Sequence, residues 1–168
     1  MSSPKAADLI ATDPTTPLPW ETVRDALSDT RMYWLATVHP TGRPHVRPVL
    51  AVWLDGVLYT TSNAAARKGR NLAADPRCSV TARTDTMDVV LEGNAIPVTS
   101  VTELNQVAEA YRAKYDWPVT VTNGAFDAPY GAPTAGLPPY HPYRITPATV
   151  YGFGTADSYG GRTTRYRF

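Results

Sequence analysis

Three strand-forming runs in the first half of the chain, joined by short turns, limit the possible folds most. Residues 32–38, 46–54 and 57–61 are rich in β-branched and aromatic side chains, which fit the half-buried surface of a sheet. The last two runs are joined by Asp55-Gly56, a pair that tolerates the positive φ that a two-residue hairpin requires. The pattern predicts an antiparallel meander.

Further strands and three short helices are predicted around this meander. The predicted helices cover residues 20–27, 64–74 and 101–115, and the predicted strands cover 78–82, 89–98, 143–145, 149–153 and 163–168. The third helix is the best defined, because Ser100 and Glu103 form a capping box ahead of an apolar helical face. The fold class is therefore mainly β with short helices (α+β). Six to eight antiparallel strands favour a closed barrel over a sandwich, although the pattern alone leaves both open.

The length of 168 residues fits one domain with a sizeable core. Residues 1–19 contain four prolines among small side chains and are expected to form a flexible arm. Residues 20–168 then form the domain. Within it, residues 116–142 carry many Pro and Gly residues and are expected to form one long loop, of the kind that is usually functional or mobile.

Composition excludes several functional classes. The net charge is +1, so no global field attracts the protein to nucleic acid or to an anionic membrane. The longest apolar run, residues 49–54, is far shorter than a membrane-spanning helix. The N-terminal segment lacks a secretory signal, and the lone Cys78 excludes an intrachain disulfide, so a soluble, cytoplasmic protein is expected. The glycine patterns of Walker, Rossmann and hydrolase sites are also missing.

The first candidate site is the strand Arg47-Pro48-Val49-Leu50. Pro48 interrupts an otherwise strong strand and removes one ladder donor. A planar, hydrogen-bonding ring would suit this backbone, and Arg47 would then face a carbonyl or phosphate oxygen. The alternative is that Pro48 only marks a strand edge or a bulge and that Arg47 is solvated.

The second candidate is the hydroxyl-rich segment of residues 59–63, followed by Arg67, Lys68 and Arg70. Hydroxyl donors, helix N-terminal amides and cationic side chains together make an anion site, and arginine adds bidentate bonds to phosphate. The alternative is a solvated basic helix face.

The third candidate is residues 163–168, where cations alternate with aromatic rings on a strand period. This pattern is expected either to form one wall of an anionic site or to be an ordinary last strand with its aromatic side inward. Stacking on single-stranded nucleic acid ranks last, because no wider basic stripe accompanies it.

Other reactive residues carry weaker signals. His39, His45 and His141 lack the carboxylate or Cys partners of a metal site and are expected at the surface, so no metal is predicted. Cys78 falls on the apolar side of an alternating strand and is expected to be a buried structural thiol.

Several short motifs, taken in order, resemble the pyridoxamine 5'-phosphate oxidase-like superfamily over about residues 30–168. The motifs are Leu35-Ala36-Thr37-Val38, Gly42-Arg43-Pro44, Arg47-Pro48-Val49, Tyr59-Thr60-Thr61, Arg67-Lys68, Asn71-Leu72, Asp75-Pro76, Glu92-Gly93 and Thr164-Arg165-Tyr166-Arg167-Phe168. The resemblance implies an FMN-binding split β-barrel that forms a homodimer, with two cofactor sites at the interface. Each site would hold flavin mononucleotide (FMN) or the deazaflavin coenzyme F-420.

The resemblance also implies roles for particular residues. Arg47, Pro48 and Val49 would lie under the ring system, Tyr59, Thr60 and Thr61 would touch ribityl and phosphate, and Arg67 and Lys68 would grip the phosphate. Arg165 and Tyr166 would close the site, although relatives often carry Trp in place of Tyr166. Arg165-Tyr166-Arg167 also departs from the Arg-x-His that holds substrate in pyridoxamine phosphate oxidase proper, which disfavours that activity.

The leading hypothesis is therefore an FMN- or F-420-dependent flavoprotein oxidoreductase that transfers a hydride to or from a small organic substrate. The alternative is a non-catalytic flavin-binding or sequestering protein. Proton donors are expected only if the long loop covers the ring, and the candidates are Tyr111, Tyr130, Tyr140 and His141. The acidic tail of F-420 needs additional cations, for which Arg43, Arg70 and Arg77 are available.

Overall fold

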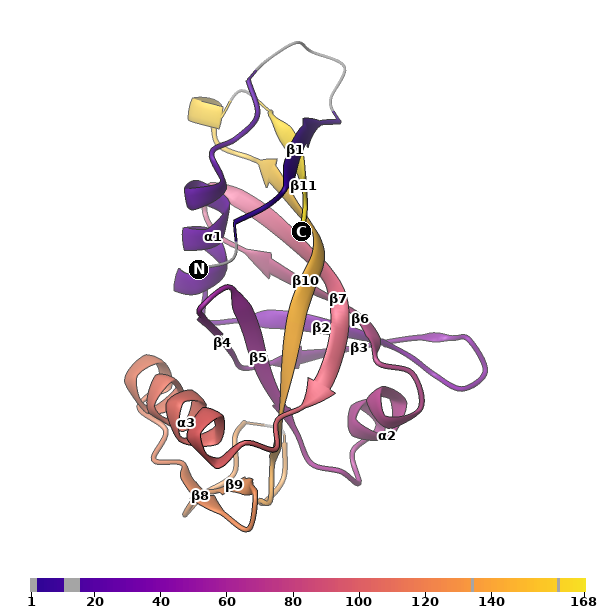
Figure 1. Cartoon of the computed structure of the whole chain (residues 1–168), viewed down its shortest axis with the longest axis vertical. Helices are drawn as coiled ribbons and strands as arrows, with labels where there is room; N and C mark the ends of the chain where they lie inside the picture. The colour runs from indigo at the N-terminus through magenta and orange to yellow at the C-terminus, as the bar shows by residue number, and fades with distance from the viewer. Residues whose placement is uncertain (1–2, 11–15, 134, 160) are drawn as a thin grey trace.

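The computed structural model describes residues 3–10, 16–133, 135–159 and 161–168. The strands are β1 (Ala6–Leu9), β2 (Tyr33–Val38), β3 (Pro44–Val49), β4 (Ala51–Leu54), β5 (Val57–Ser62), β6 (Arg77–Arg83), β7 (Met87–Pro97), β8 (Thr120–Thr122), β9 (Ala125–Asp127), β10 (His141–Gly154) and β11 (Thr163–Arg167). The helices are α1 (Trp20–Asp29), α2 (Arg67–Ala74) and α3 (Val101–Tyr115), together with the short 3-10 helix η1 (Asp157–Tyr159). Figure 1 shows their arrangement. No helix in these described ranges is long and apolar enough to cross a membrane.

Strand β10 organises the main sheet, because it pairs with three other strands. One of its edges pairs with β7 along almost its whole length. The other edge is divided between β5 at residues 141–145 and β11 at residues 149–153. All of these pairings are antiparallel, and the sheet branches at β10 (Figure 1).

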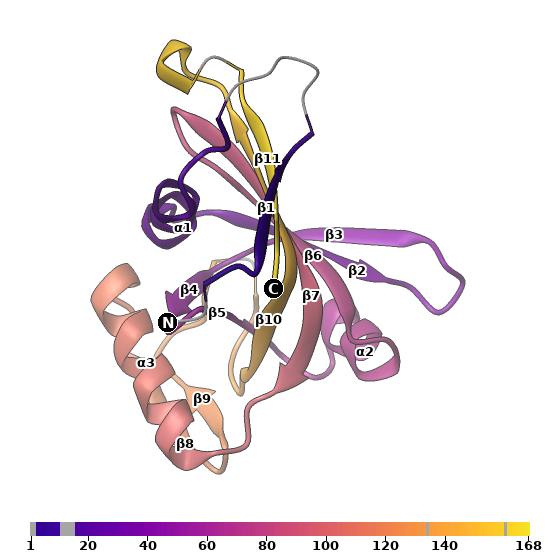
Figure 2. The same ribbon diagram turned by 45° about the horizontal axis from the view of Figure 1, so that its top comes forward.

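The two parts of the sheet meet again at β3 and β4. Strand β3 pairs with β2, whereas β4 pairs with β5. Only Leu50 separates β3 from β4, so one stretch of chain leaves one part of the sheet and enters the other (Figure 2). The strands are thus connected through the chain at Leu50 and not by a continuous ladder. The sheet is not closed into the barrel that the strand pattern favoured, but it has the predicted antiparallel split-barrel architecture.

Two hydrophobic clusters stabilise this arrangement. The larger one is enclosed by the main sheet and α1, and the second fills the space between β4, β5 and α3. Representative members of the larger cluster are Leu27, Leu35, Leu58, Val80, Leu91, Ile145 and Tyr166. Representative members of the second are Tyr59, Leu104, Val107, Tyr111, Trp117, Phe126 and Tyr140. The region between β3 and the start of α2 lies where the two clusters meet, because Val49 belongs to the larger cluster and Leu50 packs against the second.

The strand count differs from the expected six to eight, because the main sheet has nine strands and β8 and β9 form a separate hairpin. Three additional strands arise in the described residues where irregular structure was expected. Residues 6–9 of the expected arm form β1, whose backbone pairs with β11. Within the expected loop of residues 116–142, β8 and β9 pair around a turn at Asn123-Gly124, where both residues have positive φ. Other expectations for residues 1–2 and 11–15 lie outside the described residues.

The three helices form where the sequence predicted them, except that α2 begins later than expected. Ser100 accepts a hydrogen bond from the Glu103 backbone N–H and so caps α3 as predicted. Helix α2 begins at Arg67 and not at residue 64, and no side chain caps it. Asn63 instead accepts a hydrogen bond from the Ala65 N–H at 2.8 Å, which holds residues 63–66 in a turn before the helix.

Candidate functional site

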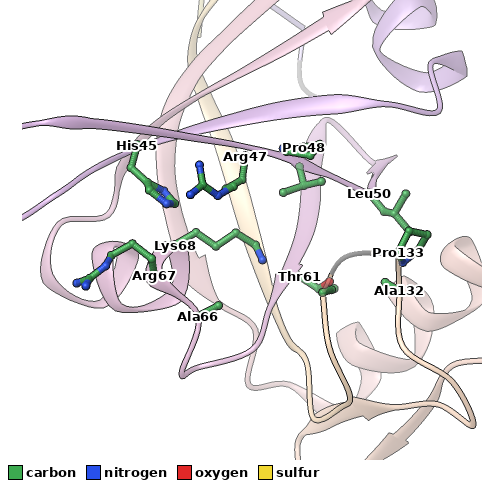
Figure 3. Close-up of a pocket in the computed structure, with 12 residues that line it drawn as sticks. His45, Arg47, Pro48, Leu50, Thr61, Ala66, Arg67, Lys68, Ala132 and Pro133 are labelled. Atoms are coloured by element: carbon green, nitrogen blue, oxygen red, sulfur yellow. The ribbon is translucent and has the colours of Figure 1, made fainter.

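A cavity of about 200 Å³ lies between β3 and the start of α2. We call it the β3–α2 pocket. Its lining comes from β3, from the end of β5, from the first turn of α2 and from the loop before β10 (Figure 3). The lining residues are His45, Arg47, Pro48, Val49, Leu50, Thr61, Ala66, Arg67, Lys68, Ala132, Pro133 and Ala135.

Strand β3 supplies the longest wall of the pocket. It pairs only with β2 among the strands of the described chain, so its other edge is free of a ladder. Pro48, which lies opposite Trp34, is tolerated on such an edge because it has no N–H to donate. The period of two along a strand places His45, Arg47 and Val49 on one face, and all three line the pocket.

The pocket is divided into a cationic end and an apolar end (Figure 3). His45, Arg47, Arg67 and Lys68 gather on one side, whereas Pro48, Leu50, Ala132 and Pro133 lie on the other. Arg47 donates to the Val46 carbonyl at 2.7 Å. Within the part of the chain that the structure describes, Arg47, Arg67 and Lys68 form no ion pair.

The electrostatics of the cationic end show an excess of positive charge. Burial lowers the pKa of Lys68, and the nearby Arg47 lowers it further. The pKa of His45 is lowered by burial and then by Arg47, Arg67 and Arg43. Because both shifts oppose protonation and no carboxylate contributes to either, this end is suited to an anion.

The apolar end is formed by a loop whose backbone is held from several sides. The Trp117 indole N–H donates to the Tyr130 carbonyl at 3.2 Å. Tyr140 is fully buried, and its hydroxyl donates to the Gly136 carbonyl. The Asn63 amide donates to the Leu137 carbonyl at 3.4 Å. The loop therefore presents Ala132, Pro133 and Ala135 to the pocket from fixed positions.

The comparison with protein families decides the classification. A family model described as pyridoxamine 5'-phosphate oxidase matches residues 19–154. The chain belongs to the pyridoxamine 5'-phosphate oxidase family. The β3–α2 pocket lies within the matched segment, so it is part of the family domain.

Solved structures share the fold of this family member. An FAD-binding protein from Mesorhizobium loti is 20% identical with a TM-score of 0.59, and the match covers 90% of this chain and 96% of that one. An F-420 reductase is 20% identical with a TM-score of 0.55, covering 80% and 98%. A heme-binding protein from Mycobacterium smegmatis is 21% identical with a TM-score of 0.65, covering 89% of this chain but 58% of that protein. At these identities the likeness concerns the fold alone. A search of curated proteins gave no match.

The structure brings six of the ten predicted cofactor-binding residues into the pocket of this family member. They are Arg47, Pro48, Val49, Thr61, Arg67 and Lys68. Thr60 lies on the opposite face of β5 from Thr61 and donates to the Leu50 carbonyl at 3.0 Å. Tyr59 shares a face with Thr61 but lies under α3, where its hydroxyl donates to Glu103 at 2.9 Å. Burial raises the pKa of Tyr59 to about 12, and the hydrogen bond to Glu103 adds to this.

The other two predicted residues lie away from the pocket. Tyr166 is fully buried in the larger cluster, and its hydroxyl donates to the Leu18 carbonyl. Arg165 lies 3.4 Å from Asp8 on β1. Alternation along β11 therefore turns its aromatic side toward the core. This matches the alternative interpretation of residues 163–168, an ordinary last strand, and not the wall of an anionic site.

The sequence analysis missed His45 and the loop residues of the pocket. His45 was assigned to the surface with His39 and His141, although its spacing of two from Arg47 was a usable signal. The loop residues carry no chemical signal, because they are small and apolar. None of the proposed proton donors Tyr111, Tyr130, Tyr140 and His141 lines the pocket.

The described part of the chain offers neither a metal site nor a reactive thiol. No three His, Cys, Asp or Glu side chains gather there in an arrangement that could hold a metal ion. Cys78 is partly buried and its thiol lies 3.6 Å from the Gly93 carbonyl. Burial raises the pKa of this thiol to about 12, so it is a poor nucleophile.

Proposed function

We propose that this family member is an oxidoreductase that binds FMN or coenzyme F-420 in the β3–α2 pocket and transfers a hydride to or from a small organic substrate. The observation that carries the proposal is the division of one pocket into a cationic and an apolar end. A molecule with a phosphate at one end and a flat ring at the other matches this division.

The phosphate would bind at the cationic end. Arg67 and Lys68 occupy the first turn of α2, where backbone N–H groups lack partners within the helix. These amides, the guanidinium and the ammonium together suit a phosphate group. Thr61 adds a hydroxyl from the end of β5.

The ring would lie at the apolar end, against Pro48, Val49 and Leu50. Ala132 and Pro133 face it from the loop, and small side chains leave room for a flat system. When bound, the flavin or deazaflavin supplies the hydride chemistry, and the protein supplies position and electrostatics. Arg47 would lie beside the ring as a hydrogen-bond donor.

We propose further that the protein works as a homodimer with the sites at the interface. The pocket volume of about 200 Å³ is below the range of about 300–1,000 Å³ that is common for ligand pockets, so a second copy would complete it. Trp34 on β2 and Val46 on β3 are 50% and 44% exposed and lie on neighbouring strands beside the pocket. These two exposed apolar side chains support the proposed interface.

The choice between the two cofactors depends on additional cations. Arg77 is held by Asp75 at 2.6 Å, which removes it from the candidates for binding the F-420 tail. Arg43 lies close enough to lower the pKa of His45, and Arg70 is exposed on α2. Neither forms an ion pair within the described residues. These two cations favour F-420 slightly.

The proposal is tested by titrating cofactor-free protein with FMN, F-420 and riboflavin while following cofactor fluorescence. Riboflavin has the ring but no phosphate, and it is expected to bind at least tenfold more weakly than FMN, since hydrogen bonds to charged groups contribute about 1.5–3 kcal/mol. The double variant Arg67→Gln, Lys68→Met should lose this discrimination. Arg83→Gln removes an exposed arginine at the far end of β6 and serves as the control. Absence of binding by both FMN and F-420 would overturn the proposal.

The alternative function is cofactor binding without catalysis. One observation favours it: the pocket-lining residues that the structure describes include no carboxyl group and no tyrosine. A bound cofactor that no reductant or substrate can reduce or oxidise would support this alternative. Turnover of the bound cofactor would support the oxidoreductase.

A further inference from the structure

Part of the wall at the apolar end of the β3–α2 pocket lies outside any strand. Leu50 separates β3 from β4, and it lines the pocket beside Pro48 (Figure 3). Strand pairing does not hold Leu50, so its backbone carbonyl needs a partner from elsewhere in the fold. Whatever holds this backbone also fixes the surface against which the ring of a cofactor would lie.

Two hydroxyl groups from different elements bind the Leu50 carbonyl. Tyr111 on α3 donates to it at 2.9 Å, and Thr60 on β5 donates to it at 3.0 Å. The Tyr59 carbonyl lies further from the Tyr111 hydroxyl, at 3.4 Å. Each hydroxyl has one proton and a carbonyl oxygen has two lone pairs, so both bonds to Leu50 form together. Both donors are shielded from water, because Tyr111 is fully buried and Thr60 is 1% exposed.

A third hydroxyl binds the next residue of the chain. Tyr115 on α3 accepts from the Ala51 backbone N–H at 3.0 Å and donates to the Ala51 carbonyl at 2.7 Å. Among the described strands β4 pairs only with β5, so this hydroxyl takes the place of a second neighbouring strand. Burial raises the pKa of Tyr115 to about 12 and also raises the pKa of Tyr111. Both tyrosines therefore keep their protons at neutral pH and remain donors.

Thr60 also connects this wall with another part of the pocket. The next residue of β5, Thr61, lines the pocket, and the proposed function assigns it to the phosphate. Alternation along β5 turns the two threonine side chains to opposite faces. Thr60 can therefore bind Leu50 while Thr61 faces the pocket. The hydrogen bond from Thr60 thus fixes the spacing between the wall beside the ring and a residue beside the phosphate.

We propose that Thr60, Tyr111 and Tyr115 are positioning residues for the cofactor ring. They hold the backbone of Leu50 and Ala51, which forms the wall beside the ring. The role rests on the proposed function, because the ring is that of FMN or F-420. A wall that is held before binding need not be ordered by the ligand, so more of the interaction energy appears as affinity. A fixed wall also sets the orientation of the ring, on which the rate of hydride transfer depends.

Riboflavin affinity tests this role, because riboflavin has the ring but no phosphate. Thr60→Val, Tyr111→Phe and Tyr115→Phe each remove one hydroxyl with little change in shape. Each should raise the dissociation constant for riboflavin about threefold to tenfold. FMN affinity should fall by the same factor, so the preference for FMN over riboflavin stays constant. Thr60→Ser keeps the hydroxyl and should bind riboflavin within about twofold of the native protein.

Thr164→Val is the matched control for loss of stability. Thr164 is fully buried on β11, which contributes no described residue to the pocket. Its hydroxyl accepts a hydrogen bond from the Leu18 backbone N–H at 2.9 Å. The control variant therefore also loses a buried hydrogen bond, but its affinity for riboflavin and FMN should stay unchanged.

A spectroscopic measurement reports the orientation of the ring independently of affinity. The visible circular dichroism of FMN is recorded with each variant at saturation, after far-ultraviolet circular dichroism has shown that the variant is folded. We expect a changed visible spectrum in the three variants that lose a hydroxyl beside the wall. Thr60→Ser and Thr164→Val should give the native spectrum. If the native protein selects F-420, then F-420 and its ribityl-deazaflavin portion without the phosphate replace FMN and riboflavin.

The positioning role and the proposed function fail in different ways. Native riboflavin affinity and a native visible spectrum in a hydroxyl variant would overturn the role of that residue, and equal changes in Thr164→Val would overturn all three roles. If the native protein binds neither FMN nor F-420, the proposed function is wrong and the positioning role is wrong with it. If binding depends on Arg67 and Lys68 but the hydroxyl variants behave as the native protein does, only the positioning role is wrong.

Discussion

Replacement of Gly93 by alanine should destabilise the barrel strongly, because no space exists for a side chain there. A Cβ built at Gly93 would lie 2.4 Å from the Thr146 carbonyl oxygen and 3.2 Å from Ile145 Cγ2. Carbon–oxygen contacts between neighbouring strands usually measure about 3.3–3.6 Å. The backbone of β7 or β10 would therefore have to move by about 1 Å.

Such a movement is costly at this position. Gly93 lies opposite Pro147 on β10 and opposite Cys78 on β6, so strands on both sides restrain it. The pairing with β10 already changes register between Pro147 and Thr149. We expect Gly93→Ala to lower the free energy of unfolding by about 3 kcal/mol. In a domain of this size the melting temperature should fall by about 6–12 °C.

Urea unfolding followed by circular dichroism measures this loss. The midpoint should fall while the slope with denaturant stays constant. Asn94→Ala is the matched control, because Asn94 is the next residue of β7 and is exposed. It should change stability by less than about 0.5 kcal/mol. A loss below about 1 kcal/mol in Gly93→Ala would show that β7 and β10 separate easily, and the steric argument would be wrong.

Three further predictions concern buried groups. Cys78 should react with iodoacetamide at pH 8 about a thousandfold more slowly in the folded protein than in urea, because burial raises the pKa of its thiol to about 12; equal rates would contradict its burial. Tyr166→Phe should cost about 1–2 kcal/mol of unfolding free energy, measured in urea, because the Leu18 carbonyl loses its donor inside the core; a neutral result would show that another group or water satisfies that carbonyl. Burial lowers the pKa of Lys114 to about 8, so the unfolded chain binds more protons above that pH, and the unfolding free energy should rise between about pH 8 and 10. Lys114→Met should lack this rise, and an identical pH profile in the two proteins would refute the assignment.

The sequence predicted the barrel well where local pattern and tertiary environment agree. The hairpin at Asp55-Gly56 joins β4 to β5, and both residues have positive φ. The Ser100–Glu103 box begins α3 as expected. Strand β1 was missed because its strength comes from backbone pairing with β11, a partner more than 150 residues away. No local pattern carries that information.

The candidate site was predicted only where chemistry is concentrated in short motifs. Arg47, Pro48, Arg67 and Lys68 were found, and the structure places them in one pocket. Thr60 was included because the motif was taken as a block, although alternation along β5 turns it to the other face. His45 was assigned to the surface, because its place in the pocket depends on α2, which only the fold brings against β3.

The branching of the sheet at β10 has a consequence for the protein during its synthesis. The edge of β5 that pairs with β10 stays unpaired until roughly eighty more residues have left the ribosome. The edge of β7 that pairs with β10 is also open until then. Exposed strand edges pair readily with other chains, and pairings between distant segments form slowly. The barrel can therefore assemble only after β10 has emerged, and until then the open edges of β5 and β7 are the parts of the nascent chain most exposed to aggregation.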